Sequence, residues 1–202
     1  MDKLFSRKSV ATVFTMLILI IGSSIDSGCA AAAGGKPDTR FIRTSCSTTT
    51  YPTLCYTALS NHASAIQQDP KLLAHVALSV SLDTARTTSV DMVRISRRAG
   101  ITPREAGAMR DCVEELSDSV EQLGRSMSEM NRMNRSNFGR TMSDIQTWVS
   151  AAMTDEDTCM EGFAGKFMNG AAKSAIRTRI VNVAHMTSNA LALINSYAAV
   201  HG

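Results

Sequence analysis

Apolar side chains recur every three or four residues along four long stretches of this chain, and no stretch shows the apolar–polar alternation of a strand. The clearest stretch starts at Thr102, which can cap a helix, with Pro103 in the first turn and Glu105 completing a capping box. Its apolar positions, alternately four and three residues apart, are Met109, Val113, Leu116, Val120, Leu123, Met127 and Met130. Such a heptad seam predicts a long helix that packs within a bundle.

The other three stretches predict three more long helices. The first begins after the capping residue Asp69, ends near Gly100 and repeats apolar residues at Leu73, Val76, Val80, Val90 and Val93. The second follows a polar loop at residues 130–140, and its inner face comprises Ile145, Trp148, Val149, Ala152, Cys159 and Phe163. The third follows a break at residues 165–170 and carries Ile176, Ile180, Val183, Ala190, Ile194 and Tyr197 on one side.

Residues 40–60 read as two short helical pieces separated at Tyr51-Pro52. Proline disfavours helix in the residue before it and suits the first position of a new helix. Four long helices with short connections predict an all-α fold, an up-down-up-down four-helix bundle. The two short helices form an N-terminal helical hairpin beside it.

Residues 1–33 have the pattern of a secretory signal peptide. Lys3, Arg7 and Lys8 precede an apolar run at residues 10–21, and small residues end the segment at residues 30–33. The run is shorter than the roughly 20 residues that span a bilayer, although an uncleaved anchor is the alternative. Residues 34–202 then form one domain, which has no second apolar run. The mature chain is therefore expected to be secreted and not to be bound to the membrane once the leader is removed.

The cysteine count also fits an exported protein. Removal of the leader discards Cys29 and leaves Cys46, Cys55, Cys112 and Cys159, an even number that could form two disulfides in an oxidising compartment. Three pairings are possible. Pairing Cys46 with Cys55 and Cys112 with Cys159 is preferred, because the first two share one small corner. The triplet that begins at Asn134 is an N-glycosylation sequon.

Composition argues against several other functions. The net charge is +3 without a block of like charges, so nucleic acid is not an expected partner. No motif for a nucleophile, a nucleotide or a cofactor occurs. The four histidines have no metal-ligand spacing: His62, His75, His185 and His201. The chain is therefore expected to bind a partner protein, with no cofactor and no metal, rather than to act as an enzyme.

Four sequence blocks occur in order through the predicted domain. They are Cys46 with the segment Tyr51-Pro52-x-Leu54-Cys55, the segment Asp111-Cys112-x-Glu114, the run WVSAAMTDEDTC at 148–159, and the run SNALAL at 188–193. Behind a leader, this order resembles the plant invertase and pectin methylesterase inhibitor family. The resemblance implies a helical bundle with a hairpin, and pairing of the first cysteine with the second and of the third with the fourth.

The resemblance also implies an inhibitor located in the apoplast and cell wall. One branch of the family inhibits pectin methylesterase, and the other inhibits acid invertase, often through a Pro-Lys-Phe loop. The nearest string here is Gly165-Lys166-Phe167, and the run at 148–159 looks like the pectin methylesterase branch. A pectin methylesterase inhibitor is therefore favoured. The alternatives are an inhibitor of cell-wall or vacuolar acid invertase and a non-inhibitory interaction scaffold.

Inhibitors of this type cover the enzyme's substrate cleft in a 1:1 complex, for which a monomer suffices. Matching positions imply contacts at Glu114, Asp118, Glu121, Gln146, Thr158 and Glu161. At about 100° per residue, an acidic stripe also lies opposite the heptad seam, composed of Asp111, Glu114, Glu115, Asp118 and Glu121. The stripe could compete for basic groups in the cleft of an enzyme that binds an anionic polymer. A solvated helix face is the alternative.

Overall fold

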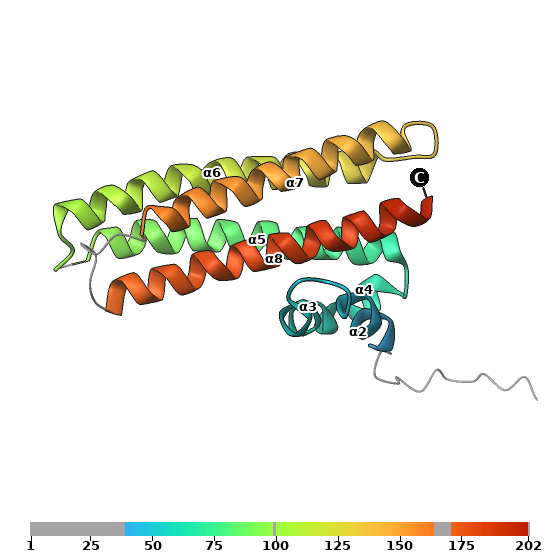
Figure 1. Ribbon diagram of the computed structural model, residues 1–202, viewed down its shortest axis with the longest axis horizontal. Coiled ribbons are helices and arrows are strands. Elements are labelled where there is room, and N and C mark those ends of the chain that lie inside the picture. Colours follow the sequence, from blue (N-terminus) through green and yellow to red (C-terminus); the bar gives the residue numbers. More distant parts are fainter. Residues whose placement is uncertain (1–38, 99, 164–170, 202) are drawn as a thin grey trace, which may run out of the picture. The chain divides into compact units, whose positions relative to one another are not determined.

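Four long helices form the bundle, as the apolar spacing predicts. They are α5 (Pro70–Ser96), α6 (Pro103–Arg132), α7 (Phe138–Glu161) and α8 (Ala171–His201). The computed structural model describes residues 39–98, 100–163 and 171–201, and every regular element in these ranges is a helix. Helix α6 packs against α5 and α7, and α8 packs against the same two helices, which closes the four-helix bundle (Figure 1). The predicted leader and the break at 165–170 lie outside the described residues.

The polar residues before α5 and α6 begin these helices as predicted. Asp69 Oδ1 accepts hydrogen bonds from the backbone nitrogens of Lys71 and Leu72, at 2.7 and 3.0 Å. The backbone nitrogen of Thr102 donates to the Glu105 carboxylate, and the Glu105 nitrogen donates back to the Thr102 hydroxyl, which completes the capping box. Helix α5 ends at Ser96 and not near Gly100, which adopts a positive φ of 87° in the turn that follows.

The buried seam of α6 differs from the predicted one at every second position. The side chains in the core are Met109, Cys112, Leu116, Ser119, Leu123, Ser126 and Met130. Val113, Val120 and Met127 are only half-buried and cover the edges of the seam. Small side chains at 112, 119 and 126 allow neighbouring helices to approach closely, so the larger apolar residue beside each one is displaced outward.

Several other apolar positions are less buried than predicted, and α6 extends further. Val90 of α5 is 68% exposed, and the half-buried positions are Val76, Val80 and Val93 of α5 and Trp148 of α7. Helix α5 instead buries small residues, among them Ala74, Ala77, Ser81 and Ala85. Because α6 continues to Arg132 and α7 begins at Phe138, the polar loop is shorter than the predicted 130–140.

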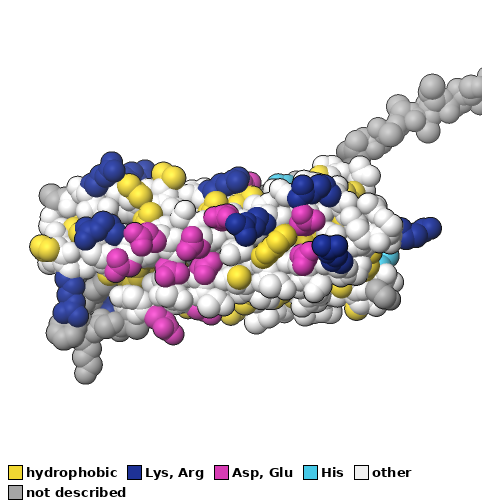
Figure 2. Space-filling view, turned by 90° about the horizontal axis from the view of Figure 1, so that it is seen from above, with side chains coloured by type: hydrophobic (Ala, Val, Ile, Leu, Met, Phe, Trp, Pro, Cys, Tyr) yellow, Lys and Arg dark blue, Asp and Glu magenta, His cyan; other side chains and the backbone are white. Residues whose placement is uncertain are grey.

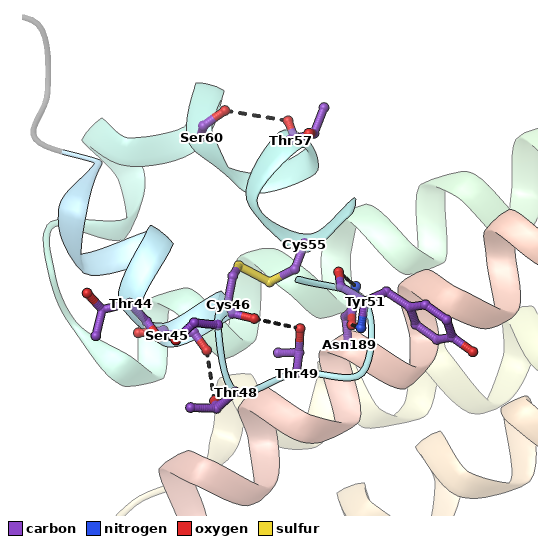
Figure 3. The surroundings of a disulfide bond; sticks show 11 residues. Thr44, Ser45, Cys46, Thr48, Thr49, Tyr51, Cys55, Thr57, Ser60 and Asn189 are labelled. Atoms are coloured by element: carbon purple, nitrogen blue, oxygen red, sulfur yellow. Dashed lines mark hydrogen bonds between the residues drawn. A yellow bond between two sulfur atoms is a disulfide. The ribbon is translucent and has the colours of Figure 1, made fainter. Parts of the chain in front are cut away.

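The N-terminal hairpin consists of α2 (Arg40–Cys46), α3 (Pro52–Leu59), the 3-10 turn η1 (Ser60–His62) and α4 (Ala63–Ile66). The predicted disulfide Cys46–Cys55 closes it, and the Thr49 hydroxyl donates to the Cys46 carbonyl at 2.9 Å (Figure 3). Tyr51 lies against Asn189 of α8 in the same view, so the hairpin is attached to the bundle.

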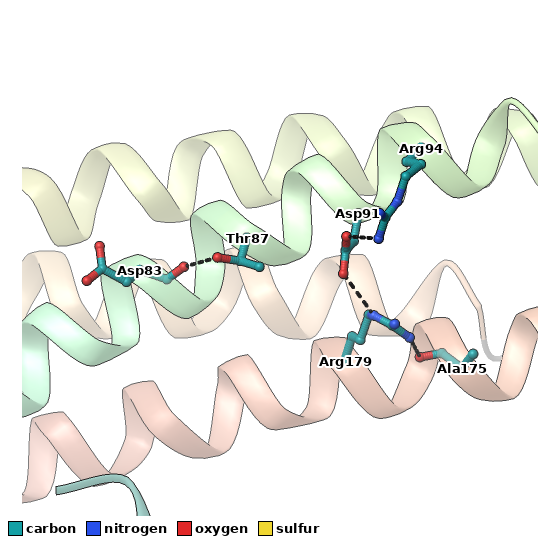
Figure 4. A network of polar contacts seen from close by, with 6 residues as sticks. All are labelled: Asp83, Thr87, Asp91, Arg94, Ala175 and Arg179. Carbon is teal, nitrogen blue, oxygen red and sulfur yellow. Dashed lines mark hydrogen bonds and ion pairs between the residues drawn. The ribbon is translucent and has the colours of Figure 1, made fainter. Parts of the chain in front are cut away.

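An ion-pair cluster joins α5 to α8 on the outside of the bundle. Asp91 accepts from Arg94 of its own helix and from Arg179 Nε of α8, the latter at 3.2 Å (Figure 4). The arginine side chains are 65% and 41% exposed, so the cluster contributes little stability beyond fixing the register of the two helices.

Candidate functional site

A disulfide holds α6 and α7 together near one end of the bundle. Cys112 of α6 and Cys159 of α7 are both buried and bonded, with Cα atoms 4.4 Å apart, which confirms the predicted second pair. The link fixes the register of the two helices that carry all six predicted contact residues. It therefore positions these side chains as one surface.

A groove of about 530 Å³ runs over this disulfide. Its lining residues are Arg104, Gly107, Ala108, Asp111, Cys112, Glu115, Thr158, Cys159 and Gly162. The small residues leave the groove open, and two acidic side chains from α6 line it together with Thr158 from α7. An added Cβ at Gly107 would meet only the Arg110 guanidinium, at 3.8 Å, so packing does not require glycine there.

The face beside the groove is acidic. Glu114, Asp118 and Glu121 are exposed on α6, and Glu121 pairs with Arg125 one turn later. Figure 2 looks onto α6 and α7 and shows acidic side chains gathered over part of this face, with Lys and Arg on both sides. Four of the five residues of the predicted acidic stripe are therefore exposed, whereas Glu115 is half-buried and lines the groove.

Asp155 of α7 faces this group of carboxylates. Burial, and after it the negative charges of Asp118 and Glu115, together raise the pKa of Asp155 to about 6. One of its oxygens, Oδ2, is buried without a hydrogen-bond partner among the described residues. The charge of the face thus depends on pH in the mildly acidic range.

Five of the six predicted contact residues lie on this part of the bundle. Thr158 lines the groove, and Glu161 is exposed one turn further along α7. Gln146 is different, because it lies 12 residues before Thr158, or about 18 Å along the helix. Its Nε2 donates to Asn195 of α8 at 2.8 Å, so this side chain is turned toward α8.

The sequon lies at the opposite end of α6 from the groove. Asn134 is exposed in the loop between α6 and α7, and its Oδ1 accepts from the Ser136 nitrogen at 2.9 Å and the Ser136 hydroxyl at 2.6 Å. About 20 residues of helix, or about 30 Å, separate it from Cys112. A glycan at Asn134 would leave the groove uncovered.

Sequence reasoning missed the buried carboxylate of Glu156. The residue is 0% exposed and occupies the core face of α7 between Ala152 and Cys159. Its position follows from the spacing of the predicted inner face, in which a buried residue is due at 156. A glutamate at such a position is easily overlooked, because acidic residues are rarely buried.

The described parts of the chain contain neither a cluster for a metal ion nor a helix for a membrane span. No three His, Cys, Asp or Glu side chains converge there in the manner of a metal site. No helix in residues 39–98, 100–163 and 171–201 combines the length and apolar character needed to span a bilayer. The geometry is that of a surface, with a shallow groove and a charged rim.

Known proteins place this architecture in a family. The chain is 44% identical to the 21 kDa protein of Daucus carota over 94% of its length and 95% of that protein. It is 40% identical to pectinesterase inhibitor 11 of Arabidopsis thaliana, covering 92% of this chain and 96% of the relative. A crystal structure of a mutant pectin methylesterase inhibitor from Arabidopsis has the same fold, with a TM-score of 0.62 at 22% identity over 76% of this chain and 95% of that one. The sequence profile of the plant invertase/pectin methylesterase inhibitor family matches residues 40–193, and the chain belongs to this family of inhibitor proteins.

Proposed function

We propose that this chain is a secreted inhibitor that covers the substrate cleft of pectin methylesterase in a 1:1 complex. The observation that carries the proposal is the acidic face on α6 and α7, held in register by the Cys112–Cys159 disulfide, in a member of an inhibitor family. The proposed contacts are Glu114, Asp118, Glu121, Thr158 and Glu161, with Gln146 at the edge of the contact area.

Charge complementarity supports this direction of binding. An esterase that acts on an anionic polymer is expected to carry basic groups in its cleft. An acidic surface on the inhibitor would steer it to that cleft and compete with the polymer there. The groove beside the stripe would accept a side chain from the rim of the cleft.

Acid invertase is the second candidate target. The loop string that often marks inhibitors of invertase, Pro-Lys-Phe, is absent, and the related Gly165-Lys166-Phe167 lies outside the described residues. The relative already described as pectinesterase inhibitor 11 favours the esterase by its name.

Secretion is inferred from the predicted leader, and location in the cell wall from membership of the family. An exported chain would meet the oxidising conditions in which both disulfides persist. Because the proposed complex needs one copy of the inhibitor, a monomer is sufficient.

The test is to incubate the purified, disulfide-bonded chain with pectin methylesterase and, separately, with acid invertase, at acidic and neutral pH. Loss of esterase activity alone is the expected result. Loss of invertase activity alone would select the second target, and full activity of both enzymes would leave only an interaction scaffold.

A further inference from the structure

The most unusual group in the core is the carboxyl of Glu156, which joins three helices. Its Oε1 accepts from the Ser119 hydroxyl of α6 at 2.8 Å and from the Thr187 hydroxyl of α8 at 2.9 Å. Its Oε2 is buried and has no hydrogen-bond partner among residues 39–98, 100–163 and 171–201. A single side chain of α7 thus links this helix to both α6 and α8, against which it packs.

Within the described residues, no positive charge is among the groups that shift the pKa of this carboxyl. On its own helix, Asp155 and Asp157 are negative neighbours. On α6, the carboxylates of Glu115 and Asp118 act on the neighbouring Asp155, and Arg125 is paired with Glu121.

On α8, the two titratable or charged groups nearest to Thr187 in the sequence are engaged elsewhere. Arg179 pairs with Asp91 of α5, and His185 stacks on Tyr51 of the hairpin with ring centroids 3.5 Å apart. A charged Glu156 would therefore be held in the core by two neutral hydroxyls alone, which is costly.

We infer that Glu156 is a proton-operated lock, which holds α7 to α6 and α8 when neutral and weakens the bundle when it ionises. The neutral acid keeps both hydroxyl bonds at Oε1 and has no charge to bury. Burial accordingly raises the pKa of Glu156, the Ser119 and Thr187 hydroxyls lower it in part, and the resulting pKa is about 7.

The raised pKa of Glu156 determines how the stability of the chain changes with pH. The pKa of Glu156 in the folded chain lies above the unfolded value of 4.5, so its contribution to the free energy of unfolding is fully present below pH 4.5. It is lost as pH rises from 4.5 to about 7. A shift of this size corresponds to a change of about 300-fold in the ratio of folded to unfolded chain.

The test compares the full disulfide-bonded chain with Glu156→Gln, because glutamine keeps the acceptor at Oε1 and cannot ionise. Denaturant unfolding would be measured from pH 4.5 to 8.5. Wild type is expected to lose much more stability over this range than the variant, with the two alike at the acidic end. If the free energy of unfolding changes with pH by the same amount in wild type and in Glu156→Gln, the inference is wrong. Asp157→Asn is the control, because it removes an exposed neighbouring charge and should keep most of the slope.

A second measurement serves if Glu156→Gln does not fold. The carboxyl carbon of Glu156 can be followed by NMR in wild type and in Thr187→Val, which removes one donor to Oε1. A wild-type midpoint well above 5 that moves higher in the variant supports the lock. A midpoint near 4.5 in wild type contradicts it, whatever inhibitory activity the chain has.

Discussion

Asn189 of α8 makes two hydrogen bonds with the backbone of Tyr51, which lies 138 residues earlier in the chain. Its Oδ1 accepts from the Tyr51 nitrogen and its Nδ2 donates to the Tyr51 carbonyl, each at 3.0 Å (Figure 3). Asn189 is 2% exposed, and the Tyr51 ring stacks on His185 one turn away. The Asn189 oxygen therefore takes the place of a backbone acceptor for the Tyr51 nitrogen, while the Tyr51 carbonyl also accepts from the Cys55 nitrogen at 2.9 Å.

Loss of this amide should loosen the hairpin. Asn189→Ala is expected to lower the free energy of unfolding by about 2 kcal/mol, because two hydrogen bonds at a largely buried site are lost. Proteases should then cleave the hairpin faster than the bundle. Asn195→Ala, on the exposed side of the same helix, is the control. Equal protease resistance in both variants would show that the hairpin is held by other contacts.

The two disulfides should contribute unequally to stability. Replacement of Cys112 and Cys159 by alanine opens a loop of 47 residues and should cost about 4 kcal/mol in the loop-entropy description. The same change at Cys46 and Cys55 opens a loop of only 9 residues and should cost less. Chemical denaturation of the two double variants gives the comparison. A larger loss from the hairpin pair would refute this order.

Neutralising Asp155 should stabilise the chain at neutral pH. Its folded pKa of about 6 lies above the ordinary 3.8, so the ionised form costs stability above pH 6 and the cost disappears below 3.8. Asp155→Asn should add about 1 kcal/mol at pH 7, after allowance for solvent screening, and little at pH 4. Unfolding midpoints at the two pH values test this. A gain of the same size at both would mean that charge is not the cause.

The acidic stripe should matter for inhibition and little for folding. The combined variant Glu114→Gln, Asp118→Asn and Glu121→Gln is expected to weaken esterase inhibition about tenfold or more, because three exposed charges are lost from the proposed interface. Its stability should change little, since all three side chains are exposed. Asp83→Asn, an exposed acid on α5, is the control. Unchanged inhibition by the triple variant would reject a role for the stripe.

Filling the groove should separate binding from stability. Gly107→Leu places a good helix former where a Cβ meets no close contact, so stability should rise by about 1 kcal/mol while inhibition weakens. Gly139→Leu is the matched control, because its Cβ would also have open space, in the first turn of α7 near Asn134. If both variants inhibit like wild type, the groove takes no part in binding.

Much of the fold could be predicted because its signals are local. Asp69, Thr102 and Glu105 cap helices through neighbours in sequence, and the spacing of Ile145, Val149 and Ala152 marks the core side of α7. The choice between Val113 and Cys112 for the core could not be read in this way, since it depends on how closely α7 approaches α6.

The candidate site was less predictable than the fold. Its acidic face follows from helical periodicity along α6 alone. The groove and the raised pKa of Asp155 require the register of α6 against α7, which the Cys112–Cys159 bond sets. Gln146 shows the same limit, because only its contact with Asn195 reveals that it points to α8.

The most direct test of the proposed role is a titration of a fixed amount of pectin methylesterase with the purified chain, with residual activity measured at each step. The account predicts a linear fall that reaches its end at one equivalent of inhibitor, and a steady complex of one copy of each protein in light scattering. An esterase that stays fully active with the chain in large molar excess would contradict it.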